Sequence, residues 1–145
     1  MNTLPQPRRW TSATFLGIAA VVFGAATLKE GGGVLFGDAA TRLAAGHYVP
    51  FVLWVNFVSG FVYVVAGVGI ALGRLWGARL GAALAVVSAV TFAALGAHIA
   101  FGGAFESRTV MAMTLRSLFW VAATWRAYAC MDGGSRGRRS AGHWA

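Results

Sequence analysis

The side chain of greatest chemical interest in this sequence is Arg116, because it interrupts an otherwise uncharged run from Thr109 to Trp125. A charged group inside such a run is costly in a membrane, and it usually faces the interior of a helix bundle or water. Guanidinium groups bind carboxylates and similar anions through two parallel hydrogen bonds. Arg116 therefore predicts either a buried ion pair or a site for an anionic ligand.

Further polar residues are expected close to Arg116. Asn56 and His98 lie within a few residues of the outer ends of their predicted helices, at a depth similar to that of Arg116. Tyr63 follows Asn56 at i+7 and so shares its helical face. Glu106 and Arg108 lie just outside this layer. The candidate ligand-binding residues are thus Arg116, Asn56, His98, Glu106, Arg108 and Tyr63.

Two interpretations of this layer remain open. In the first, Glu106 or another outer acid pairs with Arg116 and allows the arginine to stay buried, as intramembrane charges usually do. In the second, Arg116 acts with Arg108, His98 and Asn56 to bind an anion or a carboxylate. A bidentate contact between Arg116 and Glu106 in a dry core would favour the first interpretation. A wet cleft around Arg116 would favour the second.

A metal site is a third hypothesis for the same side of the membrane. The residues involved would be His47, His98, Glu106, Met111 and Met113, and the combination of His with Met suits copper. The spacing does not support it, because no two His residues stand at i and i+4, and Met111 and Met113 lie on different helix faces. We therefore assign no metal ligand from the sequence.

Signatures of the common enzyme classes are absent from the sequence. It contains no G-x-S-x-G elbow, no H-E-x-x-H pair and no phosphate-binding loop ending in Gly-Lys-Ser. The single cysteine, Cys130, excludes an intrachain disulfide and a redox pair. We assign no catalytic residue, expect that the protein is not an enzyme, and leave the cofactor unknown.

The elements that position these residues follow from composition and hydropathy. Of the 145 residues, 58% are hydrophobic and 11% charged, whereas soluble domains carry about 25% charged residues. Long apolar runs predict an all-α bundle of four transmembrane helices in a single domain. The predicted spans are about 11–28, 50–73, 80–102 and 109–129, with an outer loop at 30–49 that starts flexibly at Gly31–Gly33 and a flexible basic tail at about 132–145.

The orientation follows from the basic residues, which are retained on the cytoplasmic side of membrane proteins. With both termini in the cytoplasm, the outer segments hold Lys29, Arg42 and Arg108, whereas the cytoplasmic segments hold Arg8, Arg9, Arg74, Arg79, Arg126, Arg136, Arg138 and Arg139. We expect a multi-pass protein of the bacterial inner membrane. Because the first apolar run is longer than a usual signal core, we expect the segment before about residue 27 to stay uncleaved. The basic residues flank helices and form no face, so we expect no nucleic-acid partner.

Two segments resemble a known type of protein. They are V-P-F-V-L-W-V-N-F-V-S-G-F-V-Y-V-V-A-G and E-S-R-T-V-M-A-M-T-L-R, within residues 47–125. They resemble small bacterial four-helix inner-membrane proteins, mostly of unassigned function and similar to DoxX-like proteins. The resemblance implies a fold and a location, and it transfers no catalytic or binding residue.

Small residues at helical spacing, such as Ala85, Ala89, Ala93 and Ala97, predict close helix packing. The expected partners are the lipid bilayer and either another membrane protein or a second copy of the chain. The favoured function is an accessory or assembly subunit that binds another membrane protein. The alternative is a carrier or binding protein for a small anionic or amphiphilic solute at Arg116, and the third is handling of copper or another metal.

Overall fold

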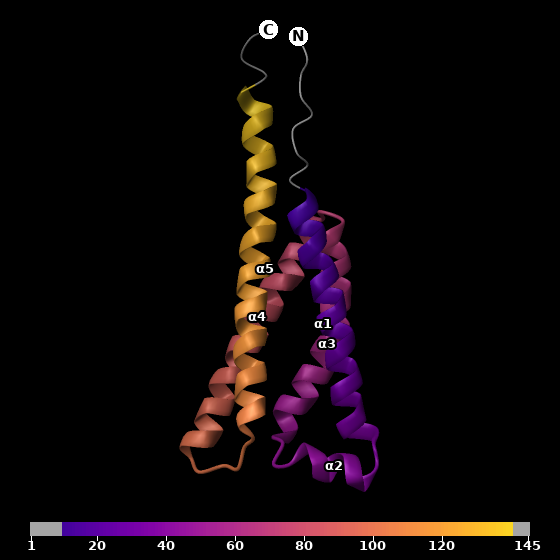
Figure 1. The fold of residues 1–145 in the computed structure, drawn as a ribbon. Helices are drawn as coiled ribbons and strands as arrows, with labels where there is room; N and C mark the ends of the chain where they lie inside the picture. Colours follow the sequence, from indigo (N-terminus) through magenta and orange to yellow (C-terminus); the bar gives the residue numbers. More distant parts are fainter. Residues whose placement is uncertain (1–9, 141–145) are drawn as a thin grey trace.

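The structure, a computed structural model, describes the backbone of residues 10–140 and the side chains of residues 12–129. Within that part, the chain forms helices α1 (Trp10–Phe36), α2 (Ala39–Ala45), α3 (Pro50–Ala71), α4 (Leu75–Ala100) and α5 (Ser107–Ser140). The four long helices run up and down in turn, and the short α2 crosses the end of the bundle away from the start of α1 (Figure 1). The prediction of an all-α fold is confirmed.

Three of these helices are long and apolar enough to cross a membrane, namely Ser12–Phe36, Pro50–Ala71 and Leu75–Ala100. The helix α5, which contains the predicted fourth span, does not reach the same apolarity. Arg116 and Arg126 lie in the part of α5 that packs in the bundle. The chain therefore has the helices of a multi-pass membrane protein.

The first predicted span ends too early. It was expected to stop near residue 28, with Gly31–Gly33 opening a flexible loop, but α1 continues through these glycines to Phe36. A Cβ atom added at Gly31 would lie 3.4 Å from the side chain of Phe57 on α3. Packing against α3 thus holds the glycine segment in a helix despite its low intrinsic helix propensity. The predicted outer loop 30–49 also contains a helix of its own, α2.

The boundaries of the other three spans also differ from the predicted ones, at some ends by a few residues and at others by more. Helix α3 begins at Pro50, as expected, since proline suits the first helical turn. Helix α4 begins at Leu75 and not near residue 80, because Gly73 adopts a φ of 65° and the turn after α3 is completed within residues 72–74. Helix α5 runs to Ser140 through the start of the predicted flexible tail, and residues 141–145 lie outside the described residues.

Helices α1 and α3 approach each other closely where small residues face one another. A Cβ atom added at Gly67 would lie 2.7 Å from the carbonyl oxygen of Gly17, and one added at Gly24 would lie 2.9 Å from that of Gly60. Such contacts let two backbones meet where lipid provides no hydrophobic drive for association. The α1–α3 pair is therefore fixed by small side chains over much of its length.

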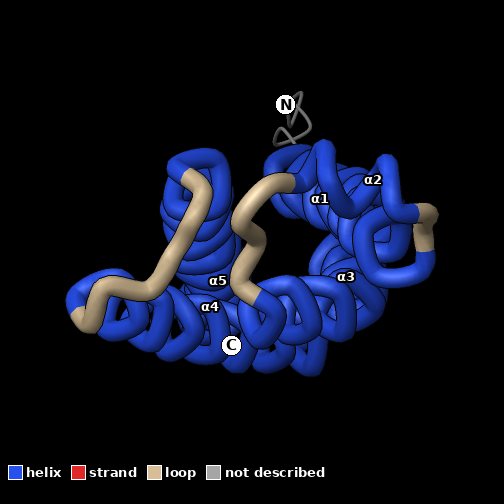
Figure 2. Tube along the Cα trace, turned by 90° about the horizontal axis from the view of Figure 1, so that it is seen from below, coloured by secondary structure: helices blue, strands red, loops and turns tan. Residues whose placement is uncertain are grey.

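Helices α4 and α5 form the other half of the bundle. Helix α4 packs against both α3 and α5, while α1 touches α5 at few points. Viewed from the α2 end, the backbones of α1 and α5 stand apart at this end of the bundle (Figure 2). Below it, Trp120 of α5 and Tyr63 of α3 are fully buried, with ring centroids 4.8 Å apart. The two halves thus close around an aromatic core and separate toward α2.

Candidate functional site

A pocket of about 670 Å³ lies where the two halves separate, between α1, α2, α3 and the first turns of α5. Its volume falls in the range of about 300–1,000 Å³ that small-molecule sites occupy. Much of its wall is apolar, formed by residues such as Phe23, Val34, Val49, Val52, Leu53 and Leu115. The polar lining comes from Thr27, Lys29, Glu30, Thr41, Tyr48, Asn56, Arg108, Thr109 and Arg116. This combination of apolar walls and a few polar groups is typical of a ligand site.

Arg116 lies deepest among the charged residues of the pocket, with only 7% of its surface exposed. Its guanidinium carbon lies 5.5 Å from the ring centroid of Phe23 and 5.7 Å from that of Tyr63. Aromatic faces attract cations, and desolvated pairs of this kind contribute about 2 kcal/mol. The two rings therefore hold the arginine in place without satisfying its hydrogen-bond donors.

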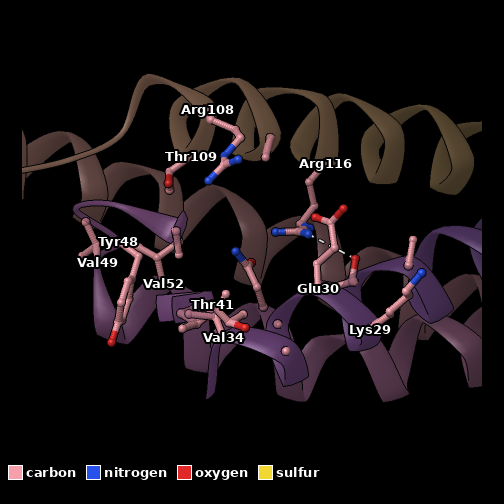
Figure 3. Close-up of a pocket in the computed structure, with 18 of the residues that line it drawn as sticks. Lys29, Glu30, Val34, Thr41, Tyr48, Val49, Val52, Arg108, Thr109 and Arg116 are labelled. Atoms are coloured by element: carbon pink, nitrogen blue, oxygen red, sulfur yellow. Dashed lines mark hydrogen bonds between the residues drawn. The ribbon is translucent and has the colours of Figure 1, made fainter. Parts of the chain in front are cut away.

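The hydrogen bonds of Arg116 are few for a buried guanidinium, which has five N–H donors. Nη2 donates to the hydroxyl of Thr27 at 3.2 Å, the bond drawn as a dashed line in Figure 3, and Nη1 donates to the sulfur of Met113 at 3.6 Å. Nε has no partner among the described residues. Neither bond ends on a carboxylate, so Arg116 has no direct ion pair among the residues whose side chains the structure describes.

The sulfur of Met113 also accepts a hydrogen bond from Nδ2 of Asn56, at 3.5 Å. Two donors from different helices therefore converge on one thioether. A thioether sulfur is a weak acceptor compared with a carboxylate or phosphate oxygen. An anion that reached this point would offer Arg116 and Asn56 a stronger acceptor than the one they have.

The acid nearest to Arg116 along the pocket wall is Glu30 and not Glu106. Figure 3 shows the side chains of Glu30 and Arg116 extending into the pocket from α1 and α5, and Glu30 attracts Arg116 electrostatically. The prediction that an outer acid approaches Arg116 thus holds for Glu30 only as a longer-range attraction.

Glu106 has a different role from the one expected. Its Oε1 accepts a hydrogen bond of 2.9 Å from the backbone N–H of His47, in the loop between α2 and α3. Because that bond directs the carboxylate toward the loop, Glu106 lies outside the pocket and does not pair with Arg116. The prediction that Glu106 contacts Arg116 is therefore wrong. Glu106 instead links the start of α5 to the loop before α3 through its hydrogen bond with His47.

His98 was also expected in the site, and it does not line the pocket. Its Nε2 lies 3.2 Å from the carbonyl oxygen of Ala104, and its ring packs edge-on near Phe51. The imidazole thus contacts the loop between α4 and α5. Helix α4 contributes no residue to the lining of the pocket. The sequence did not indicate that this face of α4 lies away from the pocket.

Of the remaining candidates, Arg108 and Asn56 line the pocket, and Tyr63 lies beneath it. Tyr63 is 1% exposed, and its ring stacks on that of Phe23 with a centroid separation of 6.0 Å. It therefore forms the floor under Arg116. Four of the six candidate residues, Arg116, Asn56, Arg108 and Tyr63, are brought together at the pocket.

The sequence reasoning missed the contribution of α1. Phe23, Thr27 and Glu30 follow one another at i+4 and i+3, so they share one face of α1 and point into the pocket. The spacing was present in the sequence. It was overlooked because the first span was ended at residue 28, which placed Glu30 in a loop.

No protein-family model, curated protein or solved structure matches this chain. The function must therefore be argued from the pocket itself. Among the described residues, no group of three His, Cys, Asp or Glu side chains is placed to hold a metal ion. Of the residues in the copper hypothesis, Met113 contacts Arg116, whereas Met111 is exposed.

Helix α2 forms part of the pocket wall, because its residues Thr41, Ala44 and Ala45 line the pocket. Asp38 caps this helix by accepting hydrogen bonds from the hydroxyl of Thr41 at 2.7 Å and from its backbone N–H at 2.8 Å. The hydroxyl bond, followed by the backbone bond, lowers the pKa of Asp38. The ionised cap thus stabilises α2 above the ordinary Asp pKa, and this stability is lost as the pH falls through the lowered value.

Replacement of Asp38 with alanine should therefore fray α2 at neutral pH, because one N-terminal donor of the helix loses its partner. Hydrogen exchange of the amides in 39–45 should become faster in the variant. In the wild-type protein, the protection of these amides, measured against an unfolded peptide at the same pH, should decrease only at acid pH. Equal exchange in both proteins at neutral pH would contradict a stabilising role for the cap.

Proposed function

We propose that this protein binds a small anionic or amphiphilic solute in the pocket around Arg116, and that it is a carrier or binding protein. The observation that carries the proposal is the environment of Arg116: it is nearly buried, it lines a pocket, and no carboxylate is among its hydrogen-bond partners in the described part of the chain. A buried guanidinium without an acidic hydrogen-bond partner is costly. A ligand carboxylate, phosphate or sulfonate would supply the missing acceptors.

The apolar wall supports an amphiphilic ligand over a small inorganic anion. Val34, Val49, Val52 and Leu53 line the part of the pocket nearer α2, and Leu115 lies beside Arg116. Burial of such surface against a hydrocarbon group contributes about 25 cal/mol per Å². An acidic head at Arg116 with a short apolar body along these residues uses both kinds of lining.

The location that fits this proposal is a bacterial inner membrane crossed four times. The fourth crossing would be made by α5, with Arg116 facing the pocket and not lipid. Helix α1 begins and α5 ends at the same end of the bundle, away from the pocket (Figure 1). With that end in the cytoplasm, as the basic residues predict, the pocket opens toward the outside. We also propose that the protein is related to DoxX-like proteins, on the basis of the two segments that resemble them.

The experiment compares three probes of equal chain length on the full chain in a non-ionic detergent. Hexanoate should raise the thermal unfolding temperature, because a ligand that binds only the folded state stabilises it. Hexylammonium and hexanol should not, since neither carries a negative charge to pair with the guanidinium of Arg116. Equal shifts with all three probes would contradict an anion site.

The accessory-subunit role stays a prediction, since no described contact favours a particular partner. Native mass spectrometry of the protein extracted in mild detergent separates the two roles. A retained small anion supports the binding protein, and a retained second polypeptide supports the accessory subunit.

A further inference from the structure

Glu30 needs an explanation within an anion site, because a carboxylate repels the ligand. It is the sole acid among the residues that line the pocket, whereas Lys29, Arg108 and Arg116 are basic. The other described acids at this end are engaged elsewhere, Asp38 as the cap of α2 and Glu106 on the backbone of His47. Glu30 accepts no such bond and is solvent-exposed.

The position of Glu30 relative to Arg116 is set by α1. It follows Thr27, the residue that accepts a hydrogen bond from Arg116, at i+3. Glu30 therefore stands on the same face of α1, one turn nearer to α2. Figure 3 shows its side chain and that of Arg116 reaching toward one another across the pocket. An anion that enters from the α2 end passes Glu30 before it reaches the guanidinium.

We propose that Glu30 is an internal counter-ion that competes with the ligand for Arg116 and so limits the affinity of the pocket for anions. This inference rests on the proposed anion-binding function. In the empty pocket, the negative charge of Glu30 offsets part of the positive charge of Arg116, which allows the arginine to remain buried. When an anion binds, it takes over that role and is repelled by Glu30, so that binding stays reversible.

The test measures hexanoate affinity by titration calorimetry on the full chain in a non-ionic detergent at low salt. Glu30→Gln should bind hexanoate about three- to tenfold more tightly at low salt, because it removes a negative charge from the lining of the pocket that holds Arg116. Lys29→Gln, which removes the neighbouring positive charge, should weaken binding. Glu106→Gln is the matched control: it removes an acid at the same end of the bundle but outside the pocket, and should leave the affinity unchanged.

Two further variants guard against an effect of the substitution itself. Glu30→Asp keeps the charge and should bind hexanoate nearly as the wild type does, whereas Glu30→Ala should behave like Glu30→Gln. Unchanged or weaker binding in both neutral variants would overturn the counter-ion role, even if Arg116→Met abolished binding. If Arg116→Met bound hexanoate as the wild type does, the anion site itself would be refuted, whatever the Glu30 variants did.

Discussion

Arg116→Met should strongly weaken the binding of hexanoate while leaving the unliganded protein at least as stable as the wild type. The loss should be on the order of tenfold to a hundredfold, because hydrogen bonds to a charged group contribute about 1.5–3 kcal/mol. Stability should hold because the variant removes a buried charge whose hydrogen-bond partners are a hydroxyl and a thioether. A methionine side chain has a similar length, and its sulfur packs well against aromatic rings such as Phe23 and Tyr63.

This result would separate a binding residue from a structural one. If Arg116 held the bundle together, its replacement would cost about 3–5 kcal/mol, the penalty usually seen when a buried ionic contact is broken. Thermal unfolding and hexanoate titration on the same preparation measure both quantities. Arg116→Ala should impair the protein further, since it also leaves a cavity.

Arg42→Ala is the matched control for Arg116→Ala. Arg42 lies on α2, is exposed, and donates a hydrogen bond to the carbonyl of Leu35. Its loss should change neither stability nor affinity appreciably, because exposed interactions of this kind contribute little. Similar and negligible effects at Arg42 and Arg116 would contradict the buried site.

Gly67→Val should destabilise the protein by about 1–3 kcal/mol, through forced overpacking between α1 and α3. A Cβ atom at this position would lie 2.7 Å from the carbonyl oxygen of Gly17 and 3.0 Å from the Cβ atom of Ala20. The backbone oxygen cannot move aside as a flexible side chain can, so the helices must separate. Because the pocket lies between α1 and its neighbours, the affinity for hexanoate should fall as well.

Gly96→Val provides the comparison on α4. A Cβ atom added there would meet no atom within 4 Å, so valine should be neutral or slightly stabilising through its higher helix propensity. Both glycines lie inside helices, and the difference between the two variants therefore isolates the contact with α1. Thermal unfolding in detergent should place Gly67→Val well below Gly96→Val. Equal unfolding temperatures would show that the α1–α3 contact tolerates separation.

The local features of this protein were determined by its sequence. Long apolar runs require helices in lipid because every backbone N–H and C=O must be satisfied within the segment. The start of α3 at Pro50 and the burial of the Arg116 side chain follow from residue type. The i+7 relation of Asn56 and Tyr63 likewise follows from helix geometry.

The tertiary structure decided which helix faces meet. His98 and Asn56 were predicted at the same depth, yet α4 places His98 against its own loop while α3 places Asn56 in the pocket. Glu106 was a predicted ion-pair partner of Arg116, but its carboxylate accepts a hydrogen bond from the backbone amide of His47. Rotation about a helix axis depends on packing with neighbours, and helices that are apolar on all sides contain no periodic signal of that rotation.

The extension of α1 also required the tertiary contact with α3. Three consecutive glycines disfavour a helix by intrinsic propensity, yet α1 continues through them, with Gly31 packed close to Phe57 of α3. That extension carries Glu30 onto the same face as Thr27, beside the pocket. The sequence thus determined that Arg116 is buried among apolar helices, and the packing of α1 on α3 decided that the acid it faces is Glu30.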